Sequence, residues 1–177
     1  MIWRPSHRAD PDVVPIADRH YNRQKIGSPQ FVPPGRCIVL KAGTRMQLRE
    51  RYTGGAFWIT SWPFAEYVKH EWGGAWICSA FRNEGAGLSS KLIREAVAIT
   101  RGIWEPPSAG IVTFINEVKT VRGRSANSAP GKCFLDAGFD GVGETRGGLI
   151  ALQMFPQDMP EPIVIENEQG LLFEHVA

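Results

Sequence analysis

Apolar residues fall into short runs along the chain, and most of these runs are rich in β-branched or aromatic side chains. Such runs, bounded by glycine and proline, are typical of β-strands. The predicted strands are 36–42, 56–62, 75–82, 110–116, 139–145 and 148–155. The last two are expected to form a hairpin across Arg146 and Gly147.

One helix stands out from the hydrophobic pattern, at residues 88–104. Its apolar positions recur at spacings of four and three: Leu88, Leu92, Ala96, Ile99 and Ile103. This spacing places them on one helical face. Two prolines directly after Glu105 end the helix, because proline cannot continue it.

Three shorter helices are predicted at 13–21, 64–72 and 132–137, the first with Asp10 or Asp12 as its N-cap. After the N-terminal helix, the main elements follow the order β-β-β-α-β-α-β-β. A group of strands followed by a β-α-β unit indicates an α+β (mixed α/β) fold.

With 177 residues, of which 43% are hydrophobic and 21% charged, the chain suits one domain with a sizeable core. We assign residues 1–155 to that domain and 156–177 to an acidic tail, which carries five acidic and no basic residues. The sequence predicts no signal peptide and no membrane span. Three widely separated cysteines, Cys37, Cys78 and Cys133, favour a reducing, cytoplasmic location.

Positive charge is concentrated before the tail, because residues 1–155 carry all 20 basic side chains but only 13 of the 18 acidic ones. Basic residues are densest at 19–51 and 118–132. This distribution favours a polyanionic partner, with a merely solvated surface as the alternative. We take DNA as the partner and expect five side chains to contact it: Arg23, Lys25, Lys119, Arg122 and Arg124.

The strongest local motif is Arg82-Asn83-Glu84-Gly85-Ala86-Gly87, between the predicted strand 75–82 and the predicted helix 88–104. Glycine lets the backbone turn sharply and expose its N–H groups, and a helix N-terminus carries a partial positive charge. The six residues therefore predict a site for a phosphate or pyrophosphate, with a plain turn as the alternative. The absence of a P-loop lysine disfavours a nucleotide triphosphatase.

The pattern Arg82-x-x-Gly85-x-Gly87 resembles the acyl-CoA pyrophosphate loop of the GCN5-related N-acetyltransferase (GNAT) superfamily, and the element order from about residue 36 to 155 is similar. The resemblance implies a central, mostly antiparallel sheet flanked by helices. In it, 75–81 and 110–116 would form a parallel pair that splays apart to admit acetyl-CoA or another acyl-CoA-like donor. Many members carry a tyrosine general acid where this chain has Phe134, which cannot deliver a proton.

A narrower resemblance is to the Mom-like phage DNA-modification proteins of the same superfamily. It rests on His20-Tyr21-Asn22-Arg23, on Ser89-Ser90 and on residues 112–116. It implies an acyltransferase acting on the exocyclic amine of adenine in DNA. Those proteins carry an aspartate at the position of Asn116, and here Glu117 is the adjacent acid.

Side-chain chemistry gives the candidate catalytic residues. Imidazole accepts or donates a proton near neutral pH, which makes His20 the candidate base. Tyr21 is the candidate acid or positioning group; alternatively its ring packs in the core and His20 caps a helix. Ser79 or Ser90 is a supplementary donor, and Asn116 completes the set.

Three other reactive side chains are given structural interpretations. Cys78 and Cys133 can act as nucleophiles, but small buried hydrophobes are the preferred interpretation. His70 is expected at the surface. The four histidines include no i,i+4 pair, so we predict no metal site.

Six aromatic residues cluster between positions 58 and 76: Trp58, Trp62, Phe64, Tyr67, Trp72 and Trp76. We interpret them as a core lining. The alternative is a stacking platform for an extruded base, since flipped bases are held between aromatic rings.

Two functions compete with DNA modification. One is an acetyl-CoA-dependent N-acetyltransferase for a small amine or a protein amine. The other is a non-catalytic module of the same fold that binds nucleic acid.

Overall fold

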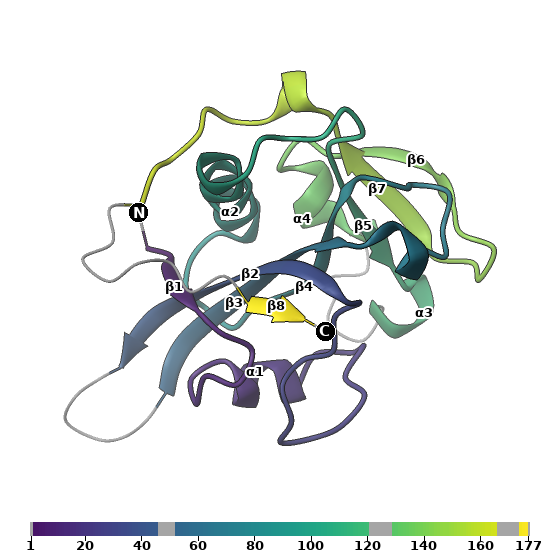
Figure 1. Cartoon of the computed structure of the whole chain (residues 1–177). Coiled ribbons are helices and arrows are strands. Elements are labelled where there is room, and N and C mark those ends of the chain that lie inside the picture. The colour runs from purple at the N-terminus through teal and green to yellow at the C-terminus, as the bar shows by residue number, and fades with distance from the viewer. Residues whose placement is uncertain (1, 46–51, 121–128, 166–173, 177) are drawn as a thin grey trace.

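The computed structural model describes residues 2–45, 52–120, 129–165 and 174–176. Its centre is a sheet with the strand order β1-β2-β3-β4-β5-β7-β6, and β8 pairs with β2 (Figure 1). The strands are β1 (Arg4–Ser6), β2 (Gly35–Arg45), β3 (Tyr52–Pro63), β4 (Trp76–Asn83), β5 (Ile111–Ile115), β6 (Asp140–Glu144), β7 (Ile150–Met154) and β8 (Glu174–Val176). The helices are α1 (Val14–Asp18), α2 (Ser89–Ile103), α3 (Glu117–Thr120) and α4 (Lys132–Leu135), with 3-10 turns η1 (Ala65–Tyr67) and η3 (Pro156–Asp158).

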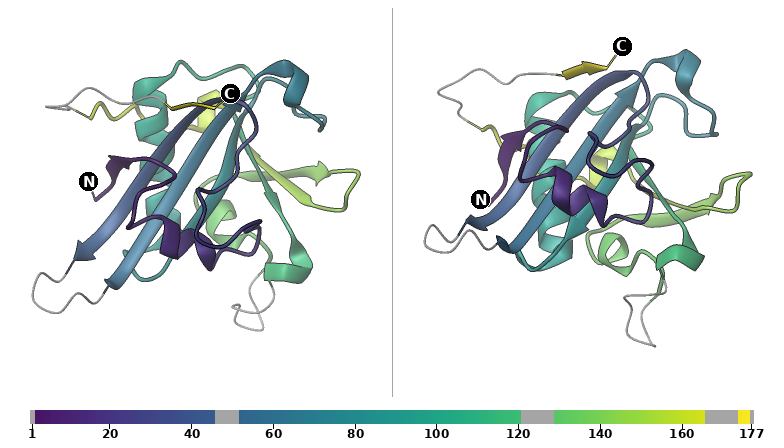
Figure 2. Two further views of the ribbon diagram at one scale, coloured as in Figure 1. Left: turned by 60° about the horizontal axis from the view of Figure 1, so that its bottom comes forward. Right: turned by 90° about the horizontal axis from the view of Figure 1, so that it is seen from below.

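The predicted α+β class with a mostly antiparallel sheet is confirmed. Among the described strands one pair is parallel, β4 with β5, and it is short. It joins Trp76 to Ile111, Ile77 to Val112 and Cys78 to Thr113. β4 then continues along β3 as far as Asn83, while β5 continues along β7. The strands part after Cys78, and Figure 2 shows the β6–β7 hairpin diverging from β2–β4.

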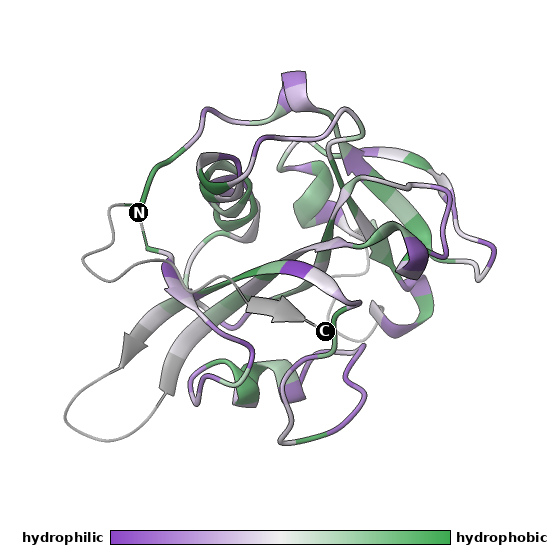
Figure 3. Ribbon diagram, viewed as in Figure 1, coloured by the Kyte–Doolittle hydropathy of each residue, from purple (hydrophilic) through white to green (hydrophobic). Residues whose placement is uncertain are grey.

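Helices cover both faces of the sheet, with α2 and α4 on one face and α1 on the other (Figures 1 and 2). Alternation along β2 explains this: Ile38 and Leu40 belong to the cluster beneath α2, whereas Cys37 and Val39 pack with the α1 residues. Side chains alternate across a strand, so one strand can serve two cores. Figure 3 shows apolar residues, in green, along much of α2 and β7.

The larger core contains the aromatic residues at the middle of the sheet. Trp58 and Trp76 are fully buried in it, which agrees with a core lining for these two rings. Phe64 and Tyr67 are both 46% exposed, so the six predicted core aromatics do not form one buried group.

The six predicted strands and the helix 88–104 are confirmed, with small changes at their ends. Two strands, β1 and β8, were not predicted. β1 is only three residues long, and its position follows from Trp3 beside it, which is 1% exposed and donates from Nε1 to Leu92 O at 2.9 Å. Such contacts across the fold leave no local pattern in the sequence.

All three short predicted helices are shorter in the structure, and the one predicted at 132–137 spans only Lys132–Leu135. The helix predicted at 13–21 spans only Val14–Asp18, and its N-cap is Val13 rather than Asp10 or Asp12. Asp10 instead accepts from the Asp12 N–H in the preceding turn, at 2.8 Å. The helix predicted at 64–72 is reduced to η1, because none of the three residues of that turn is buried against the core.

The described part of the tail lies against the domain. Ile163 N–H donates to Ala98 O on α2 at 2.9 Å, and Met159 is 5% exposed. Arg101 Nη1 donates to the carbonyls of Met159 and Pro160. Residues 156–165 therefore cover one side of α2.

Candidate functional site

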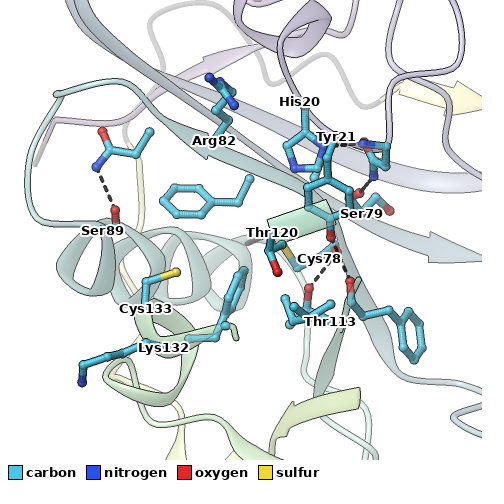
Figure 4. Close-up of a pocket in the computed structure, with 18 of the residues that line it drawn as sticks. His20, Tyr21, Cys78, Ser79, Arg82, Ser89, Thr113, Thr120, Lys132 and Cys133 are labelled. Atoms are coloured by element: carbon cyan, nitrogen blue, oxygen red, sulfur yellow. Dashed lines mark hydrogen bonds between the residues drawn. The ribbon is translucent and has the colours of Figure 1, made fainter. Parts of the chain in front are cut away.

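A cavity of about 360 Å³ opens where β4 and β5 part (Figure 4). Its lining comes from segments far apart in the sequence: residues 20–22, 78–83 of β4, 113–115 of β5 and 131–134 around α4, together with Ser89, Thr120 and Ala129. We call it the first cavity. It brings His20, Tyr21 and Ser79 together with Arg82 and Asn83. These two residues begin the motif at 82–87, which we call the glycine turn.

Two consecutive side chains bridge the parted strands. Tyr21 Oη donates to Phe114 O on β5 at 3.2 Å, and Asn22 Nδ2 donates to Ser79 O on β4 at 3.1 Å. Both carbonyls belong to the residue directly after the last parallel pair. Backbone carbonyls that lose a sheet partner need another donor when they are buried, and Tyr21 and Asn22 supply it.

His20 is held neutral in the wall of the first cavity. Burial, helped by the positive charge of Arg82, lowers its pKa to about 4, against an opposing contribution from its hydrogen bond with Asn22. Its Nδ1 donates to Asn22 Oδ1 at 2.5 Å, and its ring stacks on Tyr21 with centroids 4.6 Å apart. Burial raises the pKa of Tyr21, so its phenol is protonated at neutral pH.

The other catalytic candidates lie at different places. Ser79 lines the first cavity, and its hydroxyl is 2.6 Å from that of Ser61. Of the serine pair at the start of α2, Ser89 lines this cavity and Ser90 is not among its lining residues. Asn116 caps α3, because its Oδ1 accepts from Lys119 N–H at 3.0 Å.

The glycine turn between β4 and α2 is held by Asn83. Its Oδ1 accepts from the N–H groups of Gly85 and Ala86, at 3.1 and 2.9 Å. Its Nδ2 donates to Gly87 O and to Ser89 Oγ. Gly85 has φ +101°, a conformation that side chains disfavour.

The acid in this turn is paired with two arginines. Arg19, just after α1, donates from Nε and Nη2 to the two oxygens of Glu84, at 2.8 and 2.5 Å. Arg82 Nε lies 2.6 Å from Glu84 Oε1. The Arg19 hydrogen bonds are the main reason that the pKa of Glu84 lies below its usual value.

Phe134 and the two nearby cysteines form an apolar part of the wall. Phe134 is 6% exposed and packs on Trp58, Phe81 and Phe139. Burial raises the pKa of both Cys78 and Cys133, so neither thiol is an activated nucleophile.

A second cavity of about 640 Å³ adjoins the first. Five residues line both: Tyr21, Asn22, Cys78, Ser79 and Phe114. The second cavity has an aromatic and proline-rich wall that includes Phe31 and Tyr67, with Lys69 and Lys119 as its cations. Among the described residues that line either cavity there is no Asp or Glu.

His70 lies in the wall of the second cavity and is half-buried, not at the open surface as predicted. Its ring is 4.8 Å from that of Phe114, and burial lowers its pKa. Nδ1 accepts from Trp72 N–H at 3.2 Å, whereas Nε2 is buried without a hydrogen-bond partner.

The predicted DNA contacts have different surroundings. Arg23 does not face solvent: its side chain is 5% exposed and pairs with Asp18 at 2.6 Å, and it also donates to Gln30 Oε1. This ion pair gives Arg23 a structural role within residues 18–30. Lys25 and Lys119 are exposed, while Arg122 and Arg124 lie outside the described residues.

Sequence reasoning missed three residues that organise the site, Arg19, Asn22 and Gln30. Gln30 is 2% exposed, and its Nε2 donates to Asn22 Oδ1 at 3.0 Å. Only the position of Asn22, directly after His20 and Tyr21, was a signal in the sequence. The partners of Arg19 and Gln30 are set by the fold.

Neither a metal cluster nor a membrane helix is found in the described part of the chain. No group of three or more His, Cys, Asp or Glu residues is placed there to hold an ion. No helix among these residues has the length and apolar character needed to cross a bilayer. Comparison with protein-family models, curated proteins and solved structures gives no match to this chain.

Proposed function

We propose that the protein is a GNAT-like acyltransferase that binds an acyl-CoA donor in the first cavity and acylates an amine presented from the second. One observation carries this proposal: a single described parallel pair, β4–β5, parts after three residue pairs and leaves a cavity in the opening. Arg82 and Asn83 at the start of the glycine turn and Ser89 shortly after it line the same cavity, whereas residues 84–87 are not among its lining residues. The strand order and this turn are similar to those expected for the GNAT superfamily.

The lining of the first cavity fits such a donor. Arg82 and Lys132 supply positive charge for phosphates, and no described lining residue is acidic. Phe81, Cys133 and Phe134 form an apolar wall suited to the pantetheine arm. The donor would supply an activated thioester carbonyl, and the chain would supply its orientation and the proton transfers.

The electrostatics of the site favour an aromatic amine as the acceptor. An alkylamine is an ammonium ion at neutral pH, with a pKa of about 10 like that of lysine. Binding it calls for a carboxylate, and both cavities lack one in their described lining. His20, with its pKa lowered to about 4, is also too weak a base to deprotonate an ammonium ion.

The exocyclic amine of a nucleobase avoids both difficulties, because it is neutral at pH 7. Its lone pair is delocalised into the ring, so catalysis would depend on positioning and on proton transfer. The aromatic wall and the two lysines of the second cavity suit a base and its phosphates. We therefore favour a base in DNA, adenine first, over a small amine or a protein amine.

His20 and Tyr21 would divide the proton transfers. His20 would accept the proton that the amine nitrogen loses on acylation. Tyr21 lines both cavities and keeps its proton, so its hydroxyl would turn from Phe114 O to donate to the departing sulfur, in place of the tyrosine that Phe134 replaces. Ser79, at the same junction, is a further hydroxyl donor for the carbonyl oxygen.

Mass spectrometry of digested DNA from expressing cells tests this function. We expect an acylated nucleoside with the wild-type protein and none with His20→Ala. A thermal shift with coenzyme A but no modified nucleoside would favour the small-amine or protein-amine alternative. DNA binding without any shift by coenzyme A would favour the non-catalytic module.

A further inference from the structure

Several backbone N–H groups of the glycine turn, which could otherwise bind an anion, already donate to acceptors within the protein. Gly85 and Ala86 donate to Asn83 Oδ1. Glu84 N–H donates to Gly55 O at 2.7 Å. A diphosphate bound at this turn therefore depends on side-chain donors more than the glycine pattern suggests.

Two guanidinium groups lie beside the turn, and both are bound to one carboxylate. Glu84 accepts two hydrogen bonds from Arg19 and one from Arg82. The side chains of Arg19 and Arg82 are 49% and 37% exposed, so an anion from solvent can reach them. Arg82 also lines the first cavity, which connects this cluster to the donor site.

We propose that Arg19 and Arg82 form a binding site for the diphosphate of the donor, which the Glu84 carboxylate occupies in the free protein. This inference rests on the proposed function. The diphosphate replaces a single carboxylate with a group of higher charge and more acceptor oxygens. Arginine binds phosphate through paired N–H donors, so the exchange favours the ligand once Glu84 moves aside.

Arg19 would also link donor binding to the catalytic pair. It is followed directly by His20 and then by Tyr21 and Asn22, which bond the parted strands. A donor held by Arg19 would therefore fix the position of the segment that carries the proton-transferring groups. Arg19 is a binding residue in this scheme and takes no part in the proton transfers.

Isothermal titration calorimetry with coenzyme A, inorganic pyrophosphate and pantetheine tests the site on four proteins. These are the wild type, Arg19→Gln, Glu84→Gln and the control Arg146→Gln, which removes one charge from a side chain that is 96% exposed. We expect about fivefold weaker binding of coenzyme A and pyrophosphate to Arg19→Gln, and about fivefold tighter binding to Glu84→Gln. Arg146→Gln should match the wild type, and pantetheine, which lacks the diphosphate, should not distinguish the four proteins.

The opposite signs separate ligand exchange from simple damage to the turn, which would weaken binding in both variants. Weaker or unchanged binding to Glu84→Gln overturns the proposal, as does unchanged binding to Arg19→Gln. A third outcome is that pyrophosphate binds more weakly to Arg19→Gln and more tightly to Glu84→Gln, coenzyme A binds no better than pyrophosphate, and pantetheine does not bind. That outcome would support the anion site and contradict the acyl-CoA function. If coenzyme A binds but its affinity does not change in these directions in the two variants, the donor assignment remains supported and the Arg19–Arg82 site is contradicted. Absence of binding by all three ligands overturns both.

Discussion

The two cavities share a wall at Tyr21 and Ser79 but differ in how their polar groups are satisfied. Of the side chains that line only the first cavity, His20 is hydrogen-bonded to Asn22, and Asn83 bonds the N–H groups of Gly85 and Ala86. In the second, Phe31 is 55% exposed and Tyr67 46% exposed, while His70 Nε2 has no partner.

This difference indicates that the two cavities have different roles. A cavity whose polar atoms are already paired is preorganised, and it can hold reacting groups in fixed positions. A wider cavity with exposed aromatic rings is suited to bind a planar group that arrives from solvent. We therefore expect changes in the first cavity to affect turnover, and changes in the second to affect acceptor affinity.

The largest effect should come from His20→Ala in the first cavity. Loss of a general base lowers turnover by about 10²–10⁴-fold. Affinity for coenzyme A should fall much less than turnover, because the phosphates and the pantetheine arm are assigned to other residues of the first cavity. Rates of nucleoside acylation measured by mass spectrometry check this, with His7→Ala, an exposed histidine, as the control. Full turnover in His20→Ala would leave His20 with a structural role.

Low pH should destabilise the fold through the same histidine. His20 has a pKa of about 4 when folded and an ordinary value of 6.5. The unfolded chain therefore takes up the proton first as the pH falls, and stability is lost between these two values but not further below them. The loss is roughly 3 kcal/mol from His20, and His70, whose pKa is also lowered, adds in the same direction.

Urea unfolding over this pH range, with wild type and His20→Gln, measures that loss. The variant should show a smaller decrease in the free energy of unfolding between about pH 7 and pH 4, because it lacks the titrating ring. Equal decreases in the two proteins would show that His20 is not kept neutral by its burial.

In the second cavity, Tyr67→Ala should weaken acceptor binding about tenfold, since base–aromatic stacking contributes ~1–3 kcal/mol. Phe64→Ala is a matched control, because both rings are 46% exposed and only Tyr67 lines the cavity. Fluorescence anisotropy with a single-stranded oligonucleotide compares the two variants. The assignment of this cavity to the acceptor fails if both variants weaken binding equally, or if Tyr67→Ala also loses coenzyme A affinity.

The smallest effect should come from the two lysines of the second cavity. If Lys69 and Lys119 contact phosphates, replacing both by glutamine should make the slope of log affinity against log salt shallower by about two units on duplex DNA. All DNA sequences should be affected alike, since phosphate contacts carry no sequence information. A salt titration of wild type and double variant decides this, and an unchanged slope would place the phosphates elsewhere.

Local patterns in the sequence were enough to predict most of the sheet and α2. The spacing of Leu92, Ala96 and Ile99 reflects a buried helical face, and all three are buried, whereas Leu88, which was assigned to the same face, is the N-cap and is 63% exposed. The glycine turn was also predicted in its correct place, because it depends only on the residues between one strand and one helix. Where an element depends mainly on its own side chains, the local sequence is sufficient to predict it.

The rest depends on contacts between distant residues. Arg19 and Glu84 are 65 positions apart, and Tyr21 and Phe114 are 93 apart, so neither pair has a local signal. Arg23 is a different case, because its partner Asp18 is only five positions away, yet the sequence alone did not show that the two side chains pair. Charge in a sequence does not show which charges are already neutralised.

The bridge made by residues 20–22 has a consequence for how the protein forms during synthesis. Tyr21 and Asn22 leave the ribosome early, but the carbonyls they bond belong to Phe114 and Ser79. The chain is made from the N-terminus onward, and contacts between distant residues are slow to form. We therefore expect the site to be completed late in folding, after β5 has paired with β4, so that residues made before both strands reach their final positions after the strands do.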